Sequence, residues 1–95
     1  MSYDLAFEAK VLDALEDLGH ADVKRMRQMF LKMLALRRTP LPQDAKQLVN
    51  FRHKGMTAYR VDQGEYRIVY AVDEKSKKVY LAYLLHRGQE YREIA

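Results

Sequence analysis

The sequence predicts a single α+β domain over residues 1–95, with two helices packed on an antiparallel sheet. Three observations support this fold class. The first part of the chain changes from a short alternating pattern to a helical period, and a proline-containing segment then stops the helical pattern. The last forty residues hold three runs rich in Val, Ile, Leu and Tyr. Helices followed by consecutive strands are typical of α+β domains.

A short first strand and a first helix are expected at the N-terminus. Tyr3, Leu5 and Phe7 alternate with smaller or polar residues, as in a half-buried strand. From about Phe7 the apolar residues recur on one helical face. Gly19 follows the last of them, so we expect it to end this helix.

A second helix is predicted from about Ala21 to Leu36, because its apolar residues form one broad arc and its basic residues another. Asp22 stands where a negative charge favours the start of a helix. Pro40 and Pro42 stop the pattern, because proline has no backbone donor. Residues 39–56 are then expected to be a long basic connection, of a kind that is often functional.

The C-terminal part is predicted to be a β-meander. Its strands are Ala58–Asp62, Tyr66–Asp73 and Lys78–Leu85, separated by turn-like polar segments. The predicted element order is β-α-α-β-β-β.

The composition limits the class of function. The chain has no cysteine, so it has no disulfide framework and no thiol nucleophile. It has neither an apolar run long enough to span a bilayer nor a signal-peptide pattern, so we expect a cytoplasmic protein with no membrane partner. Residues 23–60 hold ten Lys and Arg against one acid, a balance of +9. This segment indicates an anionic partner, either nucleic acid or an acidic protein segment, or else a solvated helix face.

The candidate functional residues are cations and phenols. Nucleotide-binding glycine motifs are absent, and the three histidines have no metal-ligand spacing, so neither a cofactor nor a metal is expected. Arg67 interrupts an otherwise apolar run, where a guanidinium needs an anionic partner or an open groove. Arg60 lies shortly before the predicted turn that leads to Arg67. At the end of the last run stand three further candidates: His86, Arg87 and Tyr91.

Two motifs make the chain similar to a known family. The segment Gly64-Glu65-Tyr66-Arg67-Ile68-Val69-Tyr70 matches G-x-Y-R-[IV]-[IV]-Y, and residues 86–91 match H-R-x-x-x-Y. These two motifs occur in this order after a predicted strand and helix pair. The chain therefore resembles the RelE/ParE superfamily of type II toxin–antitoxin toxins.

This resemblance implies a fold, an activity and a set of site residues. The family fold packs two N-terminal helices against one face of a twisted antiparallel sheet and has the catalytic groove on the other. RelE-like members cleave mRNA in the ribosomal A site without metal, through attack of the ribose 2′-hydroxyl on the adjacent phosphate. Such a reaction needs a base, an acid and positive charge for the crowded phosphorane.

The resemblance also assigns roles by position. Arg67 and Arg87 match phosphate-stabilising arginines, and Tyr91 matches a tyrosine that contacts substrate or transfers a proton. His86 is a second proton-transfer candidate, because its pKa range suits acid–base chemistry near neutrality. The residues expected to bind substrate are Arg52, His53, Lys54 and Arg60.

Two departures and two alternatives accompany the assignment. Asp62 stands near a position that is often basic in relatives with R-x-R before the G-x-Y-R motif, and an aspartate there is expected to repel a phosphate. Ala58 stands where the best-known RelE toxins have a lysine. A ParE-like toxin that blocks DNA gyrase by binding, and a binding module without catalysis, are the alternatives to the endoribonuclease. The partners implied for the endoribonuclease are a cognate antitoxin, the ribosome and mRNA.

Overall fold

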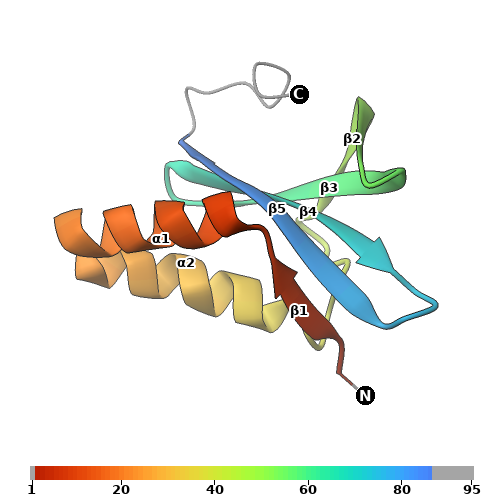
Figure 1. The fold of residues 1–95 in the computed structure, drawn as a ribbon, viewed down its shortest axis with the longest axis horizontal. Helices are drawn as coiled ribbons and strands as arrows, with labels where there is room; N and C mark the ends of the chain where they lie inside the picture. The colour runs from red at the N-terminus through yellow and green to blue at the C-terminus, as the bar shows by residue number, and fades with distance from the viewer. Residues whose placement is uncertain (1, 87–95) are drawn as a thin grey trace.

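The computed structural model of the chain describes residues 2–86, which form two helices and five strands (Figure 1). A short strand and both helices come first, and four strands follow up to the last described residue. Their bounds are β1 Asp4–Phe7, α1 Ala9–Ala21, α2 Val23–Ala35, β2 Lys46–His53, β3 Met56–Gln63, β4 Tyr66–Asp73 and β5 Lys78–His86. No helix in this part of the chain is long and apolar enough to cross a membrane.

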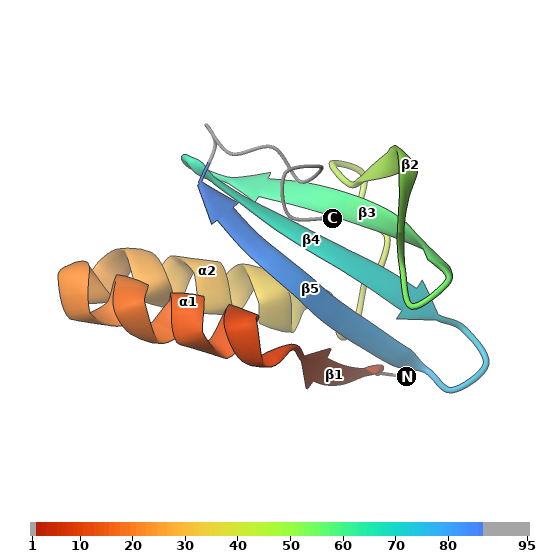
Figure 2. The same cartoon turned by 45° about the horizontal axis from the view of Figure 1, so that its top comes forward.

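The five strands form one sheet in the order β1-β5-β4-β3-β2. Strands β2 to β5 pair with antiparallel neighbours, whereas β1 pairs with β5 in parallel. Figure 2 shows both helices on one face of the sheet and β2 turning away from the plane of the other strands. The α+β fold class, with two N-terminal helices on a mostly antiparallel sheet, is confirmed.

The turn between the helices lies three residues later than predicted. Gly19 is inside α1, on the side that faces Met26 of α2, and Asp22 makes the turn instead. The backbone N–H of Asp22 donates to the Leu18 carbonyl, and its carboxylate accepts from the Arg25 N–H at 3.1 Å. The prediction that Gly19 ends the helix was wrong, because α1 continues through Gly19 to Ala21.

Residues 39–56 are not one long connection, because β2 occupies the middle of this segment. The register of β2 against β3 shifts between Gln47 and Arg52, and Asn50 has a φ of 64°. This irregularity brings Leu48 and Phe51, three residues apart, into the same buried cluster. The alternation that identifies a strand is therefore lost from the sequence, and the predicted β-α-α-β-β-β order lacked this strand.

A buried cluster lies on each side of the sheet. The larger one packs the helices against strands β3 to β5 and contains Val11, Leu15, Met29, Met33, Leu36, Val61, Ile68, Tyr70, Val79 and Leu81. On the other side, Leu48 and Phe51 of β2 cover Ala58, Val69, Ala82 and Leu85. Strand β2 therefore covers part of the face away from the helices. The end of the β3–β4 hairpin is outside this covered part, and polar residues lie there.

Candidate functional site

The β3–β4 hairpin places three charged side chains on the face of the sheet away from the helices. Arg60 and Asp62 are two residues apart in β3, so they point to the same side. Asp62 pairs in register with Arg67 of β4, which lies next to Leu85 in the register of β5. Because Leu85 belongs to the cluster away from the helices, Arg67 shares that face.

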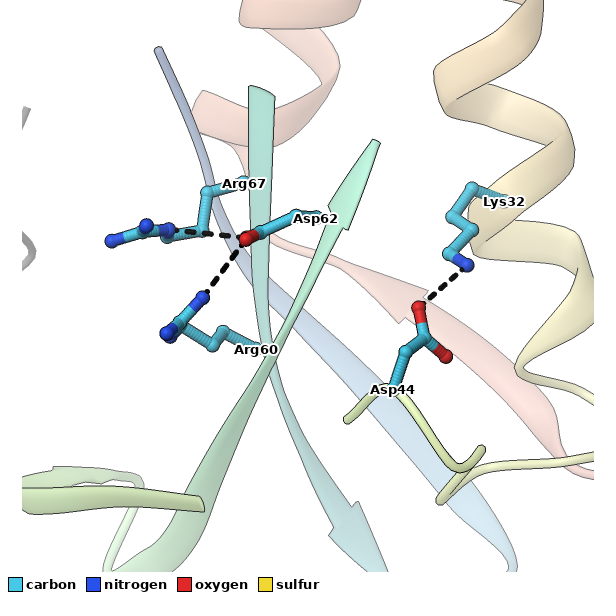
Figure 3. A network of polar contacts seen from close by, with 5 residues as sticks. All are labelled: Lys32, Asp44, Arg60, Asp62 and Arg67. Atoms are coloured by element: carbon cyan, nitrogen blue, oxygen red, sulfur yellow. Dashed lines mark hydrogen bonds and ion pairs between the residues drawn. The ribbon is translucent and has the colours of Figure 1, made fainter. Parts of the chain in front are cut away.

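Asp62 binds both arginines. Arg60 Nη1 donates to Asp62 Oδ1 at 3.1 Å and to Oδ2 at 3.0 Å. Arg67 Nε donates to Asp62 Oδ1 at 3.1 Å. Figure 3 shows the carboxylate in contact with both guanidinium groups, with the terminal nitrogens of Arg67 directed away from it.

The charges and exposure of this Arg60–Asp62–Arg67 cluster suit an anionic ligand. Two permanent positive charges and one carboxylate leave a net charge of +1. The arginine side chains are 22% and 26% exposed, whereas Asp62 is 50% exposed. The guanidinium groups are thus held against the sheet while their partner faces solvent. The sequence-based expectation that Asp62 acts only as a repulsive charge misses its role as the shared acceptor of both arginines.

The other residues expected to bind substrate lie at the opposite end of β3. In the register of β2 with β3, His53 stands opposite Met56, whereas Arg60 stands opposite Lys46. Arg52, His53 and Lys54 therefore gather at the β2–β3 turn, and the structure does not bring them together with Arg60.

Glu8, just before α1, is the shared partner at the β2–β3 turn. Its Oε1 lies 3.3 Å from His53 Nε2 and 3.5 Å from Lys54 Nζ. Partial burial by itself raises the pKa of Glu8, but the adjacent Lys54 ammonium group and the hydrogen bonds from Lys54 and His53 outweigh it and hold the pKa below 4.5. Arg52 Nη1 instead donates to the Gly55 carbonyl at 2.8 Å within the turn.

His86 lies on the helix side of the sheet, opposite to the face of Arg67. It pairs in register with Tyr66, its ring centroid is 5.3 Å from that of Tyr66, and its Nε2 is 3.7 Å from Glu65 Oε2. It also lines a pocket with Leu18 of α1. Arg87 and Tyr91 lie outside the described residues, so their predicted roles stay predictions.

Asp62 is the member of the cluster that sequence reasoning did not assign. The signal for it is present, because Arg60 and Asp62 have strand spacing and a short turn at Gly64 and Glu65 folds Arg67 back opposite Asp62. Within residues 2–86, no group of three or more His, Asp or Glu side chains is arranged to hold a metal ion.

Comparison with known proteins gives no family model and no curated protein that matches the sequence. Solved structures do match it. The chain is similar to RelE in the archaeal RelE–RelB complex from Pyrococcus horikoshii OT3, with a TM-score of 0.74 and 27% identity over 95% of this chain and 100% of that one. The chain has the RelE fold. This finding confirms the predicted resemblance to the RelE-like toxin superfamily.

Two further RelE structures share this fold at lower identity. The RelBE2 toxin–antitoxin complex of Mycobacterium tuberculosis matches with a TM-score of 0.69 and 21% identity over 92% of this chain and 100% of that one. The isolated RelE toxin of E. coli matches with a TM-score of 0.69 and 19% identity over 97% of this chain and 92% of that one. Their agreement extends over nearly the whole RelE-like domain.

Proposed function

We propose that this RelE-like chain is the toxin of a type II toxin–antitoxin pair and that it inhibits translation as a ribosome-dependent mRNA endoribonuclease. In the proposed reaction the ribose 2′-oxygen forms a bond to the adjacent phosphorus, and the bond from phosphorus to the 5′-oxygen breaks. A base accepts the 2′-hydroxyl proton and an acid protonates the leaving oxygen. The products are a 2′,3′-cyclic phosphate and a 5′-hydroxyl. The proposed location is the cytoplasm, where ribosomes translate.

The observation that carries this proposal is the pair of guanidinium groups of Arg60 and Arg67 on the open face of the sheet. A guanidinium keeps its charge at neutral pH, so it serves as a fixed positive charge and not as a base. Fixed charges aimed at a reacting phosphate stabilise the extra negative charge of the phosphorane. Arg87 is proposed as a further charge of this kind.

The proton-transfer role is proposed for Tyr91. His86 has the more suitable pKa range, but its place on the helix side, opposite to Arg67, disfavours it. A phenol with a pKa of about 10 acts as a base only beside cations, and the proposal gives this role to the arginines. Tyr91→Phe should therefore lose cleavage while ribosome binding persists, and His86→Gln should have the milder effect. Full activity in Tyr91→Phe with none in His86→Gln would reverse the assignment.

The basic turn residues Arg52, His53 and Lys54 are proposed to contact RNA away from the scissile phosphate. Their distance from Arg60 along β3 supports a binding role rather than a catalytic one. Substitution of Arg52, an exposed cation, should weaken ribosome binding more than it slows cleavage of bound mRNA. Equal loss of both would place Arg52 with the catalytic arginines.

An antitoxin is the proposed protein partner, because two of the similar structures are RelE–RelB and RelBE2 complexes. The segment 23–60 with its balance of +9 supports an acidic partner segment, and exposed apolar side chains on α2 offer contact area, namely Val23, Phe30 and Leu31. Association should slow as salt rises and the Debye length falls below about 10 Å. A salt-independent association rate would contradict this electrostatic contribution.

Induction of the chain in cells that carry a reporter mRNA tests the proposal. Primer extension should find cuts inside the reading frame, and an Arg67→Ala variant of equal abundance should remove them. Intact mRNA with accumulated gyrase–DNA cleavage complexes would favour the ParE-like alternative. Intact mRNA with normal gyrase and normal growth would favour the alternative of a binding module without catalysis.

A further inference from the structure

The Asp62 carboxylate occupies the position that an anionic ligand of Arg60 and Arg67 would take. It accepts two hydrogen bonds from Arg60 Nη1 and one from Arg67 Nε, all between 3.0 and 3.1 Å. Phosphate oxygens accept from the same donors with the same geometry. Asp62 is also half-exposed, so a ligand that approaches from solvent meets it before it reaches Arg60.

We propose that Asp62 is an internal competitor for the RNA phosphate, which sets how tightly the Arg60–Arg67 pair binds its substrate. This inference rests on the proposed function, because it assumes that RNA binds at these arginines. In the free chain Asp62 neutralises half of the charge of the pair. A bound phosphate takes over Arg60, and Asp62 turns toward solvent.

The geometry supports an exchange in which the phosphate arrives first at Arg67. This arginine uses only Nε for Asp62, and its terminal nitrogens are directed away from the carboxylate (Figure 3). A phosphate oxygen therefore has donors available on Arg67 before any contact with Asp62 breaks. Ion pairs with an exposed partner are weak, so the release of Arg60 from Asp62 opposes binding only modestly.

Asp62→Asn removes the competing charge with almost no change of shape. Two unit charges about 4 Å apart in water interact by an amount that corresponds to about a fivefold change in a binding constant. We therefore expect Asp62→Asn to bind a short fluorescein-labelled single-stranded RNA about fivefold more tightly in a fluorescence anisotropy titration. The slope of log K against log salt should also steepen by about 0.7, as for one further phosphate neutralised in single-stranded RNA.

Asp44→Asn is the matched control. Asp44 also forms an ion pair, with Lys32 Nζ at 2.9 Å, and its exposure of 52% is close to the 50% of Asp62 (Figure 3). It lies in the connection beside α2, away from the arginines. The substitution changes the net charge of the chain equally, so it should shift RNA affinity less than twofold and leave the salt slope unchanged.

The remaining variants separate the possible outcomes. Asp62→Glu keeps the charge and should bind RNA like the unaltered chain. Unchanged or weaker binding by Asp62→Asn, or equal gains in Asp62→Asn and Asp44→Asn, would overturn the competitor role.

Arg67→Ala distinguishes this inference from the proposed function. If Arg67→Ala binds RNA as tightly as the unaltered chain does, the phosphate site itself is wrong. If Arg67→Ala weakens binding while Asp62→Asn gives no gain, only the role of Asp62 is wrong. The gain expected in Asp62→Asn should disappear when Arg67→Ala is added to it.

Discussion

Replacement of Tyr70 by phenylalanine tests how the connection before β2 is fastened to the centre of the sheet. The Tyr70 ring is fully buried in β4, and its hydroxyl donates to the Pro40 carbonyl at 2.6 Å. The substitution removes one oxygen and this hydrogen bond. A hydrogen bond contributes about 0.5–1.5 kcal/mol net. The free energy of unfolding near neutral pH should therefore fall by about 1 kcal/mol, and the melting temperature by roughly 4–8 °C for a domain of this size.

At high pH, Tyr70→Phe should no longer be less stable than the unaltered protein. Burial raises the pKa of Tyr70 above its ordinary value of 10.0, so this phenol ionises first in the unfolded chain. The unaltered protein then binds more protons when folded, and its stability falls by about 1.4 kcal/mol per pH unit above pH ~10. Phenylalanine has no such proton. The difference in free energy of unfolding between the two proteins should vanish near pH ~10.7, and Tyr70→Phe should be the more stable protein by pH ~11.

Urea denaturation followed by circular dichroism at several pH values measures both effects. Comparison of the two proteins at each pH cancels the contributions that they share. Tyr3→Phe is a control, because its hydroxyl bonds the exposed Glu74 carboxylate at 2.7 Å, and its cost near neutral pH should stay below about 0.5 kcal/mol. Equal stability of Tyr70→Phe and the unaltered protein at neutral pH would refute the fastening role. A stability difference that does not narrow above pH ~10 would refute the burial argument.

Four further substitutions test the helices and the β2–β3 turn. Asp22→Ala removes the acceptor of the Arg25 N–H at the start of α2 and should cost about 1 kcal/mol in urea denaturation; an unchanged midpoint would contradict this cap. Met33→Ala opens a cavity between helix and sheet and should cost about 2–5 kcal/mol in the same assay. Leu31→Ala, at 58% exposure, should cost less than about 0.5 kcal/mol, and similar losses in both would refute the assigned helix face. Because the pKa of Glu8 is lowered in the folded chain, its contribution to folding stability is present above pH ~4.5 and is lost as the pH falls. Glu8→Gln should therefore make the stability of the protein depend less on pH in the acid range. An unchanged dependence would contradict the ion pairs of Glu8.

The elements with a regular pattern were predicted well from sequence. The bounds Tyr66–Asp73 agree with β4, because both of its faces are largely apolar and polar turns flank it. The helix pair was predicted because each helix buries one stripe of its surface. The strand β2 was missed for a physical reason. Its register shift and the left-handed Asn50 abolish the alternation, and its exposed residues, at the edge of the sheet, are polar except for Val49.

The candidate site was predictable in part. Arg67 was identified because an arginine in an apolar run needs an anionic partner, and the structure supplies Asp62 as that partner. The role of Asp62 depends on the hairpin register, which sequence alone does not fix. The separation of His53 from Arg60 depends likewise on the position of β2, which was not anticipated.

Cleavage of mRNA on purified ribosomes tests the central proposal most directly. The unaltered chain and Arg67→Ala are compared in single-turnover reactions that contain no other nuclease. Urea denaturation first shows that both proteins are folded. Loss of a preorganised charge of this kind costs about 10²-fold or more in rate. We expect in-frame cleavage by the unaltered chain, with 2′,3′-cyclic phosphate ends, and a loss of at least about 10²-fold in Arg67→Ala. Equal cleavage rates in the two proteins, or no cleavage by the unaltered chain, would contradict the proposed function.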